Sequence, residues 1–336
     1  MAGAGSLAGV RRERKAGLVL AAGTLRQDRV TAEVVAAMGA AGIETILLKG
    51  PSIARWLYPE GGRTYGDTDL LVAPGEFEHA EEVLRALGFV DAYEGFHPFE
   101  LGMYAPGLPV RVESRLVRQA GAGRGPAGAV EPHRNLPRLP IGDEVLWAEF
   151  NADTQPMSVG GVQVRVLGRT ALAFHVVLHA VQHGFGGHTA EDLRRAVAVM
   201  SVEDWSAVAD LAPRLSGADF AGYGLCWLGE EGKAIAQRVG LPVRETVPAA
   251  YWSAAAPRGS VSMAEFLTAP TWGLKLAWAR WTLVPSRAKI RYLYALDDPT
   301  RADLTAAYLR RWRQVAGSVA PAARTAWRRK RTAGRS

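Results

Sequence analysis

The N-terminal part of the chain alternates between helical periodicity and short apolar runs. Apolar side chains recur at helical spacing over residues 28–42, after a turn expected at residues 24–28. The apolar run at residues 43–49 then indicates a short buried strand. Pro51 suits the first turn of a second helix, which is expected to end before Pro59.

Alternating patterns continue along the next hundred residues. Residues 68–72 indicate a strand, and a Pro-Gly turn separates it from a helix expected over residues 76–87. Residues 110–113 alternate with period two, and the two glycines within residues 159–162 favour a hairpin between alternating strands. After Leu167 the pattern is helical almost to the end. These patterns predict an α+β fold, with a short mixed sheet flanked by helices and a largely helical C-terminal region.

Four segments are expected from this organisation. Residues 119–140 hold four Gly and four Pro, which is typical of a loop that serves as a lid or a disordered insertion. We therefore predict a flexible basic arm, a core that contains this loop, a helical domain and a basic disordered tail, over residues 1–15, 16–168, 169–323 and 324–336.

Composition narrows the class of protein. With 48% hydrophobic and 22% charged residues, the chain is globular, because a disordered chain would be less apolar. Its one cysteine, Cys226, excludes a disulfide framework and a cysteine-based zinc cluster. No convincing targeting signal and no apolar window of about 18 residues occur. We therefore expect a cytoplasmic protein without a membrane span.

The net charge of +7 does not identify a nucleic-acid binder. Residues 11–15 carry +3 and residues 324–336 carry +6, which leaves −2 for residues 16–323. Nucleic-acid affinity comes largely from Lys and Arg that neutralise phosphates. A nearly neutral body therefore predicts no specific nucleic-acid partner.

Candidate chemistry gathers at Asp67 and Asp69. Residues i and i+2 of a strand point to the same face, so these two carboxylates are expected side by side. Adjacent carboxylates repel unless a proton or a cation lies between them, and Mg²⁺ prefers such oxygen ligands. A solvated strand end is the alternative interpretation, because an Asp-x-Asp pattern alone is weakly specific.

Two further features favour a phosphate substrate. Gly50 makes a turn between the apolar strand and the Pro51 helix, where backbone N–H groups and the Ser52 hydroxyl could hold a phosphate. The Walker pattern is absent. Glu113 ends an alternating strand, where it could add a third carboxylate, although a surface-facing glutamate is the alternative.

Together these residues resemble the nucleotidyltransferase superfamily with the polymerase-beta-like fold. The similarity is closest to a bacterial family often encoded beside lasso-peptide and other peptide natural-product genes. The matching text covers residues 47–72, "LLKGPSIARWLYPEGGRTYGDTDLLV", and residues 110–114, "VRVES", with weaker matches around His179 and His183 and near residues 289–300.

The resemblance implies transfer of a nucleoside monophosphate from an NTP to an acceptor. Asp67, Asp69 and Glu113 would bind two Mg²⁺ ions, with Mn²⁺ as the alternative metal. The resemblance assigns the binding of the nucleotide and its phosphates to Lys49, Gly50, Ser52, Arg63 and Gly66.

The chain departs from the family pattern at two positions. Glu113 stands where the family more often has Asp, and Arg115 stands where it often has His, two residues after the third carboxylate. Arg115 and His183 are candidates for the acceptor side. His175, His179 and His183 would line one helix face, for which structural packing is favoured over zinc binding.

The acceptor is expected to be a hydroxyl or phosphate group, on a peptide, another natural-product intermediate or another small molecule. A non-catalytic module that binds a nucleotide or peptide for a biosynthetic complex is the main alternative, and a metal-dependent nuclease is another. Residues 271–294 interleave Trp and Tyr with Lys and Arg. Packing as a helical core is favoured there over peripheral contact with a membrane surface or a peptide.

Overall fold

The computed structural model describes residues 4–97, 112–119, 126–137, 139–243, 266 and 271–333. The chain divides into two compact units. The first comprises residues 1–92, 113–134 and 150–168, and the second comprises residues 93–112, 135–149 and 169–336. The predicted α+β class is confirmed, since a mixed sheet is followed by a helical region.

A mixed sheet forms the centre of the first unit. Among the described residues it has seven strands, in the order β3-β4-β5-β2-β1-β7-β6. In chain order they are β1 (Thr45–Leu47), β2 (Thr68–Val72), β3 (Val90–Asp91), β4 (Leu116–Gln119), β5 (Pro126–His133), β6 (Thr154–Val159) and β7 (Val162–Leu167). The pairs β2–β5 and β1–β7 are parallel, and the other pairs are antiparallel.

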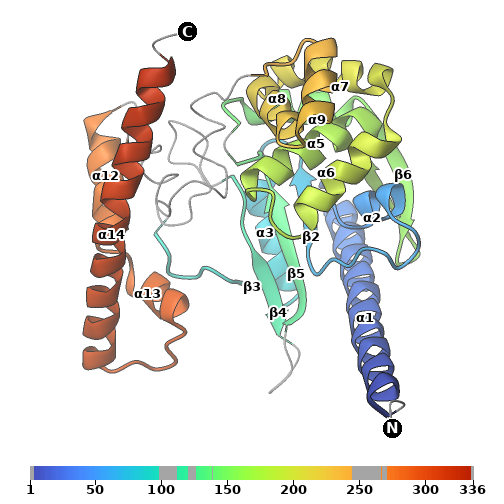
Figure 1. The fold of residues 1–336 in the computed structure, drawn as a ribbon. Helices are drawn as coiled ribbons and strands as arrows, with labels where there is room; N and C mark the ends of the chain where they lie inside the picture. Colours follow the sequence, from blue (N-terminus) through green and yellow to red (C-terminus); the bar gives the residue numbers. More distant parts are fainter. Residues whose placement is uncertain are drawn as a thin grey trace. The chain divides into compact units, whose positions relative to one another are not determined.

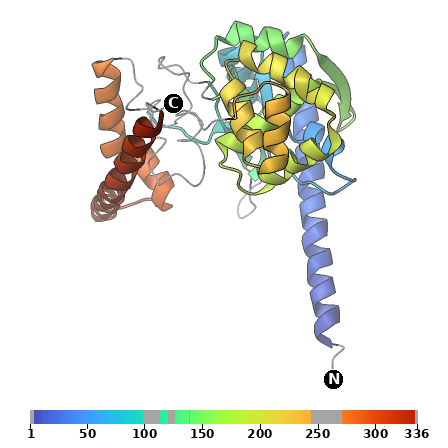
Figure 2. The ribbon, with the colours of Figure 1, turned by 45° about the horizontal axis from the view of Figure 1, so that its top comes forward.

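The helices of the first unit pack on this sheet. They are α1 (Ala4–Ala40), α2 (Pro51–Leu57) and α3 (Phe77–Ala86). Val30, Val34 and Met38 of α1 join a core cluster with Leu70 of β2 and Val130 of β5. The N-terminal part of α1 extends beyond the sheet (Figures 1 and 2). The predicted strands at 43–49 and 68–72, the helices at 51 and 76–87, and the hairpin at 159–162 are confirmed.

Two local predictions were wrong. The turn expected at residues 24–28 is absent, because α1 continues through it and buries Gln27 and Val30 against the sheet. The loop expected over residues 119–140 contains β5, whose Gly and Pro have structural roles. A Cβ atom at Gly128 would lie 2.7 Å from Val30 Cγ2, so α1 can approach β5 closely only at a glycine. Pro132 lacks an N–H group, but its carbonyl accepts a hydrogen bond from Ser114 N.

The predicted strand at residues 110–113 is only partly testable. Val110 and Arg111 lie outside the described residues, and Glu113 forms an isolated antiparallel bridge with His133. The regular strand in this region is β4, which starts three residues later.

The second unit is helical. It contains most of helix α4 (Asp143–Asn151). The other helices described in it are α5 (Arg169–Gln182), α6 (His188–Val199), α7 (Val202–Arg214), α8 (Ala218–Cys226), α9 (Glu230–Arg238), α12 (Trp272–Leu283), α13 (Arg287–Tyr294) and α14 (Arg301–Ala333). The helix α14 thus extends into the segment expected as a tail. None of the described helices combines the length and apolar character needed to cross a membrane.

Residues 271–294 do not form the buried helical core that was favoured from the sequence. None of the residues of α12 is buried, and Ile290 is the one buried residue of α13. The apolar side chains of α12 surround its axis, so neighbours that cover only part of its circumference cannot bury them all.

Candidate active site

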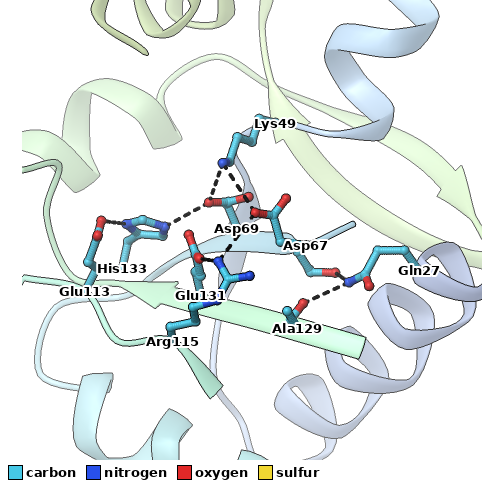
Figure 3. Close-up of polar contacts among 10 residues, drawn as sticks. Gln27, Lys49, Asp67, Asp69, Glu113, Arg115, Ala129, Glu131 and His133 are labelled. Carbon is cyan, nitrogen blue, oxygen red and sulfur yellow. Dashed lines mark hydrogen bonds and ion pairs between the residues drawn. The ribbon is translucent and has the colours of Figure 1, made fainter. Parts of the chain in front are cut away.

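Two adjacent strands bring the predicted aspartates together with Lys49. Asp67 immediately precedes β2 and Asp69 lies within it, while Lys49 follows the neighbouring strand β1. Lys49 Nζ lies 3.1 Å from Asp69 Oδ1 and 3.8 Å from Asp67 Oδ2 (Figure 3). Both carboxylates therefore project to one side, as strand alternation predicts.

The parallel strand β5 adds an acid and a histidine that the sequence analysis did not select. Its register places Glu131 beside Asp69 and His133 beside Leu71. His133 Nε2 lies 3.2 Å from Asp69 Oδ1. Asp69, Glu131 and His133 each offer one ligand atom within 4.8 Å of the others. This cluster lies where β2 pairs with β5, and these two strands are in the middle part of the sheet order. Figure 3 shows its side chains beside Lys49.

Glu113 and Arg115 reach the cluster from the segment that leads into β4. Glu113 Oε2 lies 3.1 Å from His133 Nδ1, so Glu113 contacts Asp69 only through the imidazole. Arg115 forms an ion pair with Glu131, and its Nη1 also lies 3.8 Å from Asp67 Oδ2. The structure thus brings both predicted residues to the site but places Glu131 between Arg115 and Asp69.

Burial and charge pairing shift the pKa values of this cluster. Burial alone would lower the pKa of His133, but its contacts with Asp69 and Glu113 outweigh burial and raise the pKa to about 10. Burial and the charge of Asp69 raise the pKa of Glu131 to about 7. Burial opposes ionisation of Asp69, yet Lys49 and His133 hold its pKa well below the usual range.

The helix α1 holds β2 and β5 together directly beneath these side chains. Gln27 Nε2 donates hydrogen bonds to Thr68 Oγ1 at 2.7 Å and to the carbonyl of Ala129 at 2.9 Å. Thr31 Oγ1 lies 2.7 Å from Thr68 Oγ1 and donates to the carbonyl of Gln27. Thr68 directly precedes Asp69, and Ala129 lies two residues before Glu131, so this buried network links the two strands that carry the acids. Figure 3 shows the contact of Gln27 with Ala129.

The donor set fits a divalent cation. Asp69 is 2% exposed, and its Oδ2 atom is buried without a hydrogen-bond partner. A buried carboxylate oxygen without a donor is costly unless a cation or water satisfies it. Carboxylate oxygens suit Mg²⁺ and Mn²⁺. Both ring nitrogens of His133 face carboxylates and its pKa is raised, so His133 pairs with the acids as a protonated imidazolium.

The residues expected to bind phosphate lie around the start of α2 and the loop before β2. Gly50 has a φ of 76°, which favours glycine, and a Cβ atom there would lie 3.5 Å from Tyr65 Cδ2. The Ser52 hydroxyl is buried without a hydrogen-bond partner. Arg63 is buried, and Gly66 directly precedes Asp67. Tyr65 anchors the loop to α1, because its hydroxyl donates to Asp28 Oδ1 at 2.6 Å.

The histidines of α5 belong to the second unit. The ring centroids of His175 and His179 lie 5.9 Å apart, and those of His179 and His183 lie 4.3 Å apart. The predicted shared helix face is therefore confirmed. The acceptor-side role of His183 stays a prediction.

A signal for Glu131 and His133 was present in the sequence. The nucleotidyltransferase resemblance includes a carboxylate followed two residues later by His, and Glu131-Pro132-His133 shows this spacing. The Gly and Pro residues around this Glu-x-His spacing indicated a loop, so the two residues were not selected as candidates. Glu113 and Arg115 were the poorer match to the same pattern.

Comparison with known proteins finds one family that covers most of the chain. Residues 7–230 match the model of a protein family described as "Uncharacterised nucleotidyltransferase". No curated protein matches the chain.

Two solved structures share a weaker likeness. An antigenic nucleotidyltransferase-like protein from Paracoccidioides brasiliensis has 12% identity and a TM-score of 0.34, over 58% of this chain and 93% of that one. The antibiotic-resistance factor ANT(2'')-Ia has 13% identity and a TM-score of 0.36, over 55% of this chain and 89% of that one.

Proposed function

The chain belongs to the uncharacterised nucleotidyltransferase family, and from this premise we propose that it transfers a nucleoside monophosphate from an NTP to an acceptor hydroxyl or phosphate with release of pyrophosphate. The observation that carries the proposal is the meeting of Asp67, Asp69 and Glu131 at one point of the sheet, beside Lys49. Four ionisable groups in so small a space are typical of a catalytic site.

Asp67, Asp69 and Glu131 would hold the metal, either Mg²⁺ or Mn²⁺. When bound, divalent ions would stabilise the charge that develops on the attacking and leaving oxygens. Asp69 supports this role because its Oδ2 atom still lacks a partner. Glu131 supports it because the parallel register keeps it beside Asp69.

We assign the third carboxylate to Glu131 and give Glu113 a positioning role. Glu113 Oε2 contacts His133 Nδ1, and the opposite ring nitrogen contacts Asp69. A carboxylate on one ring nitrogen fixes the orientation of the imidazole and keeps a proton on that nitrogen. Glu113 would thus hold His133 in the orientation that supports Asp69.

The cations around the site would bind the triphosphate. Lys49 contacts both aspartates, and Arg115 pairs with Glu131. The turn at Gly50, the Ser52 hydroxyl, Arg63 and Gly66 would complete the phosphate side. Their support is the family resemblance together with the unpartnered, buried Ser52 hydroxyl.

The test is nucleotide transfer by the purified full chain. We would supply each labelled NTP with Mg²⁺ or Mn²⁺ and a host extract, and follow labelled products by mass analysis and pyrophosphate release. Asp69→Asn should lower transfer roughly 100-fold or more without unfolding the protein, because the metal contributes several kcal/mol of charge stabilisation. Glu78→Gln, at an exposed acid of α3, is the matched control. Full metal-dependent turnover by Asp69→Asn would refute the assignment.

The identity of the acceptor rests on the resemblance alone. A peptide or another natural-product intermediate is the acceptor we propose, in the cytoplasm. Addition of a nucleotide to a peptide or to another natural-product intermediate in the host extract would support this proposal, and labelling confined to molecules of neither kind would reject it.

A non-catalytic nucleotide-binding module is the second candidate. The ion pairs of the site favour this candidate, because Lys49 already contacts both aspartates and Arg115 contacts Glu131. These cations neutralise the carboxylates that would otherwise bind the metal. Calorimetry distinguishes the two candidates. Binding of an NTP without pyrophosphate release, even with the extract present, would favour the module.

A further inference from the structure

The helices α12–α14 lie beyond the family match, which ends at residue 230. They contact one another, since Trp312 Nε1 of α14 donates to the carbonyl of Leu283 and Tyr308 donates to the carbonyl of Pro285. Figures 1 and 2 both show α14 running beside α12 and α13. Nucleotidyl transfer gives these helices no role.

One side of α12 is occupied by other parts of the second unit. The ring of Trp281 stacks on His97 at a centroid distance of 3.7 Å. The ring of Trp278 lies 5.8 Å from that of Phe266. These contacts fix which side of α12 faces the protein.

The opposite side presents bulky apolar residues to solvent. At about 100° per residue, Trp272, Leu276 and Leu283 lie within roughly 40° of one another and about opposite to Trp281. Their exposed fractions are 74%, 67% and 46%. We call these three residues the α12 stripe. Large apolar side chains exposed together on one face mark an interaction site.

Cations flank the α12 stripe on both sides. The same helical geometry places Lys275 about 60° to one side of Trp272 and Arg280 about 80° to the other. Residues 271–336 contain 15 basic and three acidic side chains, so they carry +12, whereas residues 1–270 carry −5. The positive charge is therefore concentrated in the region that also exposes the stripe.

We propose that the α12 stripe docks on the surface of an anionic phospholipid bilayer. An interfacial helix buries Trp and Leu at the boundary between headgroups and acyl chains, while flanking Lys and Arg attract anionic lipids. A nucleic acid would also attract the cations, but the leucines of the stripe have no complement on a phosphate backbone. The combination of charge and exposed leucine therefore favours the bilayer. This inference is independent of the proposed transfer reaction.

The test is flotation of the full chain with vesicles. Wild-type protein should bind phosphatidylcholine vesicles that contain phosphatidylglycerol, and should bind pure phosphatidylcholine vesicles at least about tenfold more weakly, since each cation near an anionic leaflet strengthens binding roughly fivefold. The double variant Trp272→Ser/Leu276→Ser should lose about tenfold or more in affinity for the anionic vesicles, because both apolar contacts are removed.

Leu25→Ser is the matched control, because Leu25 on α1 is 64% exposed and lies far along the chain from the stripe. It should bind anionic vesicles like the wild type. Circular dichroism and the melting temperature of the double variant should match those of the wild type, since the replaced side chains are exposed. Three results would overturn the proposal: no binding of anionic vesicles, equal binding by a folded double variant, or tighter binding of a DNA or RNA duplex that the double variant loses.

Discussion

Asp69 is the residue on which the site depends. It is buried, its Oδ1 atom contacts both Lys49 and His133, and its Oδ2 atom has no hydrogen-bond partner. A carboxylate in this setting stays ionised at neutral pH, because two cations compensate for its loss of hydration. The role of each nearby acid therefore depends on whether it lies beside Asp69 or reaches Asp69 through another side chain.

Glu131 lies beside Asp69 in the strand register, whereas Glu113 reaches Asp69 only through His133. Glu131→Gln should lower transfer roughly 100-fold or more and raise the Mg²⁺ concentration needed for half-maximal rate, because a metal-binding oxygen is lost. Glu113→Gln should lower the rate by roughly tenfold, since it acts only on the orientation of His133. Steady-state kinetics over a Mg²⁺ titration measures both. If Glu113→Gln lowered the rate more than Glu131→Gln, Glu113 and not Glu131 would be the third metal-binding carboxylate.

The raised pKa of His133 predicts how the stability of the metal-free protein depends on pH. Below the ordinary value of 6.5, folded and unfolded chains both hold the proton, so the full stabilisation is present. As the pH rises through the folded value of about 10, this contribution is lost. Glu131, raised to about 7, acts in the same direction at lower pH.

We therefore expect the free energy of unfolding in EDTA to fall by a few kcal/mol between pH 6.5 and 10. Urea unfolding at several pH values measures the change. His133→Gln should flatten this dependence, because it removes the titrating imidazole. An equally steep decline in the variant would assign the effect to other groups.

At the scale of elements, the contact between α1 and β5 positions the acids. Gly128 lacks a side chain where Val30 of α1 packs, and Gln27 bridges β5 to β2 one helical turn earlier. This contact keeps Glu131 at the level of Asp69. The glycine and the valine should therefore act as a coupled pair.

Gly128→Ala should destabilise the protein by about 1–3 kcal/mol, since its methyl group would overlap Val30. Val30→Ala removes the overlapping atoms, so the double variant should be more stable than the sum of the two single changes predicts. Urea unfolding of the four proteins measures this coupling. If the two changes in the free energy of unfolding were strictly additive, Gly128 and Val30 would not be coupled, and β5 would accommodate the methyl group by moving away from α1.

An element could be predicted from the sequence when the residues that determine it lie close together in the chain. The strands β1 and β2 and the helices α2 and α3 carry their periodicity, turns and proline within a few residues, and the sequence predicted them. The strand β5 could not be predicted in this way. Gly128 is required by Val30, which lies about a hundred residues earlier in the chain. Pro132, near the end of β5, has no N–H group and accepts a hydrogen bond only through its carbonyl. Glu131 and His133 were missed for the same reason.

At the scale of the whole molecule, charge and chemistry are separated along the chain. The residues assigned to the candidate active site belong to the first unit, apart from His183, whereas the basic charge and the α12 stripe belong to helices beyond the family match. The sequence predicted that the basicity lies near the ends. It could not predict the stripe, because exposure depends on which side of α12 the remaining chain covers.

The sheet order also bears on synthesis of the protein. β1 lies between β2 and β7, and its parallel partner β7 ends at Leu167, about 120 residues after β1 itself. A nascent chain that has not yet reached Leu167 leaves one edge of an apolar strand unpaired, and such edges associate with other chains. Apart from His183, the residues assigned to the candidate active site end at His133, yet the sheet that carries them is completed only later. Its folding on the ribosome therefore has to wait for a hairpin that contributes no residue to the chemistry.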